Sequence, residues 1–557
     1  MLRPISVTGA VLAILSTSPA TAQVTSRSSV DSAGLEGDST SELSSISADL
    51  RVVVFISASS NLDASDTNGL LDVFVHDRNT GVTAAVSITP SGKTGNNNSG
   101  GISFPPSISF DGRFVAFSSD AGNLVSGMKT HGTQVFVRDR LLGTSTCVSV
   151  DSSGNEGDNT SEAPALSSDG IFVAFDSYAS NLVANDTNGK ADVFVRNLAT
   201  GVTELISIGI NSAPGNDDSL SPFLSADGSV VAFSSRASNL VAIDSNSVLD
   251  AFEFDRSALV MTRVSMGPGG VEGNGISAAT SLSADGNAVC MHTLASNLVA
   301  VDTNGVMDCV VFDRSLQVCE LISVDSSNNQ GNSVSSLGSI SANGAFVAFQ
   351  SHASNLVSGD TNGTLDIFLR DRFSGSTTRL SVDSAGVEAT SGAYAPSVSA
   401  DGQTTTFSSG SSNLVGSDAN GMIDVFVRDM HIASWKNYGS GLSGTNGIPS
   451  LVSLTNPIIG STITVDLSNS SGQPTVGLLI VGFSEASIPT HFGADLQVLP
   501  SFVIPISFSY GSNSYIGILP SGTEWSGFVV DLQGVELDAG APAGVSFSQG
   551  LELILGV

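Results

Sequence analysis

The sequence predicts an all-β protein, in which a seven-bladed β-propeller is followed by an antiparallel β-sandwich. Three observations predict this fold. A unit of four short strands recurs over residues 23–434, with aligned turns 62 and then repeatedly 58 residues apart. The segment 24–31 matches the fourth strand of an internal copy. From residue 435 to 557 the repeat is absent, and short apolar stretches alternate with Gly and Pro.

The clearest copy of the unit is 167–208. Asp169-Gly170 indicates a tight turn, because Gly accepts a positive φ without steric cost. Ala199-Thr200-Gly201 indicates a second turn, between two stretches rich in β-branched and aromatic residues. Four antiparallel strands with short first and third turns are typical of one propeller blade. The strands are expected at 162–168, 172–175, 192–196 and 202–208.

Seven copies of the turn predict seven blades. The unit resembles the WD40-like (PD40) repeat of TolB-type β-propellers, on Ser225-Ala226-Asp227-Gly228 with Val231-Ala232-Phe233 and on Asp366-Ile367-Phe368-Leu369-Arg370-Asp371. This resemblance implies a propeller with protein partners. Propellers of that family usually have six blades, so six is the alternative number. The aligned turns begin at Ser47, Ser109, Ser167, Ser225, Ser283, Ser341 and Ser399.

The seventh copy lacks a fourth strand of its own. Its third strand ends at Asp429, and the chain then continues to Trp435 without another turn and strand. At the other end of the chain, 25–34 matches 377–386, which includes the fourth strand of the sixth copy. We therefore expect the N-terminal strand 24–31 to complete the last blade and close the ring. Closure removes two exposed sheet edges, which otherwise promote aggregation.

The two ends of the chain carry their own signals. Residues 1–22 fit a secretory signal peptide, with Arg3, an apolar core at 5–15 and the small-residue cleavage site Ala20-Thr21-Ala22. We expect a protein that is secreted, either extracellular or in the periplasm or cell envelope, with no membrane span after cleavage. The segment 435–557 is predicted to be a sandwich of about eight strands. Its opening resembles C-terminal β modules of secreted bacterial proteins that begin with Tyr-Gly-x-Gly.

Composition excludes several classes of function. The chain has 52 acidic and 20 basic residues and a net charge of −32, so binding to nucleic acid or to an anionic membrane is not expected. Neither a Gly-x-Ser-x-Gly elbow nor a His-Glu-x-x-His motif is present, and we assign no catalytic or cofactor-binding residue. The chain has four cysteines, for which two interpretations stay open. All four pack as small buried hydrophobic residues, or two of those in the fifth copy form a disulfide. They are Cys147, Cys290, Cys309 and Cys319.

One polar constellation, Asp-x-Asn-Gly-x-x-Asp, recurs between the second and third strands of six copies, with Ser247 replacing the Gly in one. Oxygen-bearing side chains around a Gly turn resemble part of a Ca²⁺ loop. Two interpretations stay open: weak Ca²⁺ sites, or loop caps in which Asp and Asn bind main-chain N–H groups. The candidate metal ligands are Asp66, Asn68, Asp72, Asp186, Asn188, Asp192, Asp244, Asn246, Asp250, Asp302, Asn304, Asp308, Asp360, Asn362, Asp366, Asp418, Asn420 and Asp424.

The alternation of strands places every long loop on one face of the propeller, called the long-loop face below. It carries the loops between second and third strands and the connections between successive copies. We predict a non-enzymatic binding or scaffold protein whose protein or polysaccharide partner binds this face. The alternative is a propeller hydrolase or carbohydrate-active enzyme, which a cluster of non-repeated polar residues at the channel mouth would favour.

Overall fold

The computed structural model describes residues 23–101, 104–129, 131–430, 434–455, 457, 462–483, 485–490, 495–508, 512–519, 529–541 and 544–555. The predicted signal peptide, 1–22, lies outside these residues. The described chain divides into two compact units, Thr25–Arg428 and a unit that starts at Asp429. Among the described residues, no helix has the length and apolarity that a membrane span requires.

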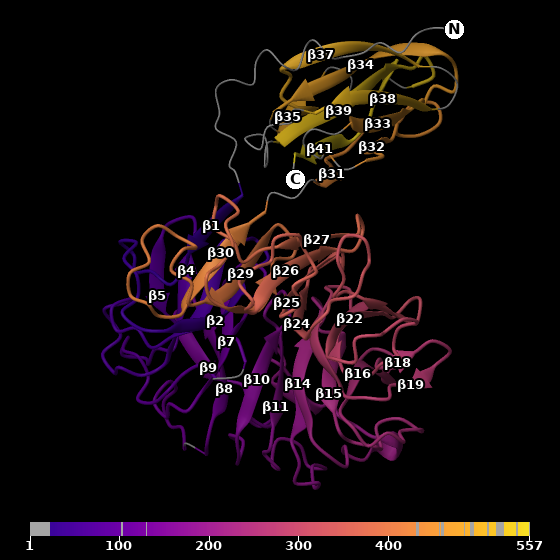
Figure 1. The fold of residues 1–557 in the computed structure, drawn as a ribbon. Helices are drawn as coiled ribbons and strands as arrows, with labels where there is room; N and C mark the ends of the chain where they lie inside the picture. Colours follow the sequence, from indigo (N-terminus) through magenta and orange to yellow (C-terminus); the bar gives the residue numbers. More distant parts are fainter. Residues whose placement is uncertain are drawn as a thin grey trace. The chain divides into compact units, whose positions relative to one another are not determined.

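The unit Thr25–Arg428 is a propeller whose described residues form seven four-stranded antiparallel sheets (Figure 1). The predicted fold class is therefore confirmed, with seven blades instead of six. We number the blades from the N-terminus and call the strands of each blade A to D. Blades 1 to 3 contain β2 (Ser41–Ile46), β3 (Val52–Ser57), β4 (Asp72–Asp77) and β5 (Val82–Ala85); β6 (Ser107–Ile108), β7 (Phe114–Ser119), β8 (Gln134–Asp139) and β9 (Thr144–Cys147); and β10 (Ser161–Leu166), β11 (Phe172–Ser177), β12 (Asp192–Asn197) and β13 (Val202–Leu205).

Blades 4 to 6 follow the same order. They contain β14 (Ser219–Leu224), β15 (Val230–Ser235), β16 (Asp250–Asp255) and β17 (Val260–Arg263); β20 (Ser277–Leu282), β21 (Ala288–Thr293), β22 (Asp308–Asp313) and β23 (Val318–Leu321); and β24 (Ser335–Ile340), β25 (Phe346–Ser351), β26 (Asp366–Asp371) and β27 (Ser376–Arg379). Two short elements lie in the D–A connections on either side of blade 4. They are the 3-10 turn η1 (Ile210–Ser212) and the hairpin of β18 (Met266–Gly267) with β19 (Val271–Glu272).

Blade 7 joins the two ends of the repeat region. It contains β28 (Ala393–Val398), β29 (Thr404–Ser409), β30 (Asp424–Asp429) and the N-terminal β1 (Val24–Arg27), and β1 is paired with β30 (Figure 1). The Ser28 N–H donates to the carbonyl of Val425 at 2.8 Å. Val425 and Val427 share one buried cluster with Phe55 and Phe74 of blade 1. Packing between blade 7 and blade 1 completes the ring.

Phenylalanines from strands B and C are the largest fully buried side chains of the core. Phe175 and Phe194 stack with ring centroids 5.8 Å apart, and both are fully buried. Equivalent pairs occur in six blades, whereas blade 5 has Met291 and Val310 there. Each buried Phe contributes roughly 1.5–3 kcal/mol. The four cysteines are free thiols; the two closest Sγ atoms, of Cys290 and Cys309, are 3.7 Å apart.

The A–B turns link neighbouring blades at the tight-turn end. The Ser168 N–H donates to the Ala226 carbonyl of the next blade at 2.9 Å, and five further turn-to-turn bonds of this kind continue around the ring. Gly170 has a φ of +71°, and a Cβ there would collide with Phe114 of the preceding blade. Turn geometry and inter-blade contact therefore both require Gly at this position.

The second unit is a β-sandwich. One sheet has the order β31-β41-β39-β34-β37 with β40 beside β39, and a smaller sheet has the order β32-β33-β38. Leu451, Ile463 and Leu467 of the smaller sheet share a core with Leu479 and Leu553 of the larger one. The strands are β31 (Ser434–Tyr438), β32 (Leu451–Ser453), β33 (Thr462–Ser468), β34 (Thr475–Gly482), β35 (Glu485–Pro489), β36 (Asp495–Val498), β37 (Phe502–Phe508), β38 (Ser512–Ile518), β39 (Val529–Leu537), β40 (Val545–Phe547) and β41 (Gly550–Ile554).

Candidate functional site

The last aspartate of each acidic loop is the first residue of a strand C. Asp72 starts β4 and lies opposite Ser57 in the register with β3, so the sheet fixes its position. Its side chain is fully buried, as is that of Asp192 at the start of β12. A carboxylate at this place needs polar partners within the fold, because burial removes its water. The equivalent residues are Asp250, Asp308, Asp366 and Asp424.

Each of these carboxylates accepts a hydrogen bond from a serine that follows strand D. Ser87 Oγ donates to Asp72 Oδ1 at 2.6 Å. The same serine accepts the N–H of Val73 at 3.0 Å, so it connects strand C to the following connection. The serine–aspartate bond recurs in the other five loops through Ser207, Ser265, Ser323, Ser381 and Ser29.

The loop asparagines are caps in the structure. Asn68 Oδ1 accepts the N–H of Leu70 at 2.7 Å, and Asn68 Nδ2 donates to Asp72 Oδ2 and to the Gly95 carbonyl, both at 2.8 Å. The side-chain oxygen is therefore engaged by main chain, and the amide joins the B–C loop to the D–A connection. Equivalent asparagine-to-carbonyl bonds occur at Asn188, Asn246, Asn304, Asn362 and Asn420.

Burial makes the last aspartates weak acids. It raises the pKa of Asp72 to about 7 and that of Asp192 to about 6, against hydrogen bonds that act in the opposite direction. The charges of Asp66 and Asp186 in the same loops raise these pKa values further. The loops therefore hold carboxylate pairs whose charge the fold compensates only in part.

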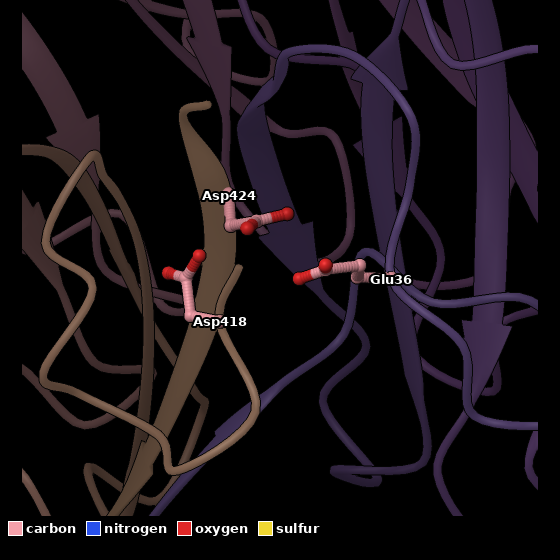
Figure 2. A group of neighbouring side chains, drawn as sticks. All are labelled: Glu36, Asp418 and Asp424. Carbon is pink, nitrogen blue, oxygen red and sulfur yellow. The ribbon is translucent and has the colours of Figure 1, made fainter. Parts of the chain in front are cut away.

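In blade 7 a guanidinium lies among the carboxylates of the loop. Arg27 Nη1 is 2.7 Å from Glu36 Oε2 and 3.0 Å from Asp424 Oδ2. The same nitrogen is 3.8 Å from Asp418 Oδ1. Figure 2 shows the carboxylates of Glu36, Asp418 and Asp424 close together, and one oxygen of each lies within 4.8 Å of one oxygen of each of the others. The Arg27 side chain is only 5% exposed, so this blade has a built-in buried cation.

Blade 4 has the same arrangement. Arg263 Nη1 lies 3.6 Å from a carboxylate oxygen of Asp244 and of Asp250, and 2.5 Å from Glu272 Oε1. Burial acts to raise the pKa of Glu272, but hydrogen bonds from Ser245 and the Arg263 guanidinium outweigh it and lower the pKa to about 2. Glu272 is thus an anion that holds the guanidinium in place. The equivalent residues of blade 6 are Arg379, Asp360, Asp366 and Glu388.

Blade 5 uses an amide where these blades use a guanidinium. Gln330 stands at the position of the glutamate and donates from Nε2 to Asp302 Oδ1 at 2.9 Å and to Asp308 Oδ2 at 2.8 Å. The equivalent of the arginine is Leu321. One donor therefore bridges both aspartates of this loop.

Blades 1 and 3 have neither a buried guanidinium nor a bridging glutamine amide at this loop. Ala85 and Leu205 stand at the arginine position, and Thr94 and Pro214 at the glutamate position. Asp66 Oδ2 and Asp186 Oδ1 are buried there without a hydrogen-bond partner. Blade 2 has no aspartate pair, because Gln134 starts its strand C.

The Asp and Asn positions were predicted from the sequence, whereas the arginine and glutamate were missed. They come from strand D and the D–A connection, which lie outside the motif. The sequence contains a pattern that could have identified them. Arg and Glu occur together, nine residues apart, in three copies, and in each of these the Arg precedes the serine that binds the aspartate by two residues.

Non-repeated polar residues occur around the centre of the ring, where strands A of adjacent blades are neighbours. Tyr394 Oη donates to Glu42 Oε2 at 3.0 Å. Asp176 Oδ2 accepts the N–H of Ser221, which has a φ of +54° within a bulge of strand A. Ser234, Gln350 and Ser408 cap equivalent bulges. Asp176 therefore supports backbone geometry, and burial raises its pKa to about 7.

No protein-family model and no curated protein matches the chain. Among solved structures, a TolB-like protein from Agrobacterium tumefaciens is 13% identical with a TM-score of 0.31, covering 70% of this chain and 90% of that one. Prolyl oligopeptidase B from Galerina marginata is 10% identical with a TM-score of 0.39; the match covers 78% of this chain and 56% of that one. The GH74 enzyme of Niastella koreensis is 12% identical with a TM-score of 0.22, at 91% and 90% coverage.

Proposed function

We propose that this protein is an exported, non-enzymatic β-propeller that binds an extended segment of a partner protein on the long-loop side of blade 4. Two adjoining grooves, of about 460 and 550 Å³, support this proposal. Both include Val241 and Met261, so they lie along strand D of blade 4, and the second groove runs from the B–C loop to Leu259 in the C–D turn. They are bounded by the two short elements that depart from the repeat, η1 and the β18–β19 hairpin.

Exposed apolar side chains around these grooves carry the proposal. Ile243 is 74% exposed, Val271 is 55% exposed and Ile210 is 48% exposed. A group of exposed apolar residues with polar residues at its border is typical of protein-binding surfaces. Within the described residues β17 pairs only with β16, so its outer edge offers main-chain groups to an added strand.

The charge of the protein indicates the chemistry of the partner segment. The net charge is −32, and Glu272 borders one groove. A partner segment with apolar side chains flanked by Lys or Arg would complement both properties. Export is proposed from the signal-like residues 1–22, and the partner is therefore expected outside the cytoplasm.

A photo-cross-linking amino acid at position 243 or 271 tests this function in the organism's envelope and secreted fractions. We expect a discrete adduct from both positions, competed by an apolar, basic peptide and abolished by Ile210→Asp. Matched positions on exposed C–D turns, 142 and 373, should give no adduct, because Leu142 and Phe373 are exposed but lie at the other end of the strands. Adducts from 142 and 373 alone, or peptide or glycoside hydrolysis by the purified protein, would overturn the proposal.

A further inference from the structure

The acidic loops differ in what compensates their aspartate pair. In blades 4, 6 and 7 a buried guanidinium lies among the carboxylates, and in blade 5 the Gln330 amide donates to both aspartates. Two different residue sets, in four loops, thus place hydrogen-bond donors at the same point of the repeat. This point is therefore a place where the fold requires positive charge or donors.

Blades 1 and 3 have the same aspartate pair with neither a guanidinium nor a bridging amide, although in blade 1 the buried Thr94 hydroxyl lies beside Asp66. Asp66 is 7% exposed and Asp186 is 6% exposed, and each has one buried oxygen without a hydrogen-bond partner. Asp418 of blade 7 has two such oxygens, but the Arg27 guanidinium lies 3.8 Å from one of them. The facing aspartates, Asp72 and Asp192, accept one serine and one asparagine hydrogen bond each, which leaves lone pairs on both of their oxygens. Two buried carboxylates without a cation are costly for the folded state.

We propose that the loops of blades 1 and 3 each bind one divalent cation, with Ca²⁺ preferred, between Asp66 and Asp72 and between Asp186 and Asp192. The cation takes the place that the guanidinium occupies in blades 4, 6 and 7. One divalent ion balances the two negative charges of each pair. This site is separate from the grooves of blade 4, so its test does not depend on the proposed function.

The donor set determines the choice of ion. The two aspartates of each loop offer carboxylate oxygens, and hard oxygen donors suit Ca²⁺ and not softer metals. Two carboxylates provide at most four of the six to eight oxygens that Ca²⁺ takes, so main-chain carbonyls and water must provide the others. Few protein ligands predict weak sites, with dissociation constants on the order of 10⁻⁴–10⁻³ M as in extracellular modules.

Equilibrium dialysis of the full mature chain with Ca²⁺ at fixed ionic strength tests the proposal, together with Tm in chelator and in Ca²⁺. We expect two ions per chain and a higher Tm in Ca²⁺. Asp66→Asn and Asp186→Asn should each remove one ion, and the double variant should remove both together with the rise in Tm. The matched control Asp360→Asn should still bind two, because a guanidinium already fills its loop.

A converse variant keeps the test valid if an asparagine variant fails to fold. Leu205→Arg with Pro214→Glu gives blade 3 the pair found in blades 4, 6 and 7, and should leave one ion per chain with blade 3 stable in chelator. Two ions still bound by this variant would contradict the proposal. Unchanged Ca²⁺ binding by the Asp66→Asn/Asp186→Asn double variant, or six ions bound per chain, would also overturn the proposal. So would a Tm that is equal in chelator and in Ca²⁺ and changes only with pH.

Discussion

The aspartate that starts strand C has a serine partner in each of six blades, but the free energy needed to bury it differs between blades. Asp424 has Arg27 at 3.0 Å, whereas Asp72 has only hydroxyl and amide donors. Removal of one partner from a buried pair typically costs about 3–5 kcal/mol, because the other charge stays buried. Different blades therefore compensate the same buried carboxylate with different side chains. We expect the stability of the loops in blades 1 and 3 to depend most on pH.

The first prediction concerns pH. Burial raises the pKa of Asp72 to about 7 and of Asp192 to about 6, from 3.8. A raised folded-state pKa means that the folded protein binds the proton more tightly, so stability is full below about pH 4 and falls as pH rises through 6–7. At about 1.4 kcal/mol per pKa unit, ionisation of Asp72 alone should lower the free energy of unfolding by roughly 4 kcal/mol between pH 4 and pH 8 in chelator.

Denaturant titrations at pH 5 and pH 8 in chelator measure how the free energy of unfolding changes with pH. Asp72→Asn should reduce the difference between the two pH values, since Asn does not ionise. Equal free energies of unfolding at both pH values would show that these carboxylates are not protonated in the folded protein.

Prediction from sequence worked at the residue scale where the information was local. Asp66, Asn68 and Asp72 lie within seven residues, and both the motif and its capping role were visible in the sequence. Arg27 and Glu36 belong to the loop of Asp424 only through closure of the ring, across 397 residues for Arg27. No local pattern encodes such a contact. The internal comparison of copies could have indicated it, because Arg and Glu occur together in three copies, although Glu156 of blade 2 has Cys147 at the arginine position.

At the scale of elements, strand β1 is the piece whose placement decides whether blade 7 is complete. It fills the outer position of that blade beside β30. Thr25 Oγ1 also donates to the carbonyl of Val382 in blade 6, at 2.6 Å. The strand thus ties blade 7 to its neighbour as well as to itself. Its similarity to 377–386 made this placement predictable, since equivalent sequences occupy equivalent strands.

The second prediction concerns this strand. Deletion of residues 23–31 should expose the edge of β30 and bury Asp418 and Asp424 without Arg27, so the protein should aggregate and melt at lower temperature. Light scattering and calorimetry measure both effects. Arg27→Met keeps the strand and removes only the cation; it should lower stability by about 3–5 kcal/mol without aggregation. A monomeric truncated protein with unchanged Tm would refute the role of β1.

At the scale of the whole molecule, the chain combines a repeat whose copies support one another with a β-sandwich that has its own core. Leu451, Leu479 and Leu553 pack together within the sandwich. The end of the 58-residue period indicated the change of architecture, whereas the six-stranded order of the larger sheet was not predictable, because its strands share no repeat that identifies partners.

The third prediction is that 23–434 and 435–557 fold independently. Limited proteolysis should cut within 430–447, where a Gly/Ser-rich stretch follows the repeat, and release two fragments that each keep their own melting transition. Mass spectrometry of the fragments locates the cut. Cleavage within the blades while 430–447 stays intact would place the boundary elsewhere.

Closure by the N-terminal strand also has a consequence for biosynthesis. Arg27 and Asp424 are 397 residues apart in the chain. At a synthesis rate of about 5–20 residues per second, Arg27 leaves the ribosome roughly 20–80 s before its partner exists. During that interval the arginine and its strand lack their partner strand, while the residues of blades 1 to 6 are synthesised one blade after another. The last step of ring assembly therefore joins the first and the last synthesised segments of the repeat, and it cannot precede the synthesis of β30.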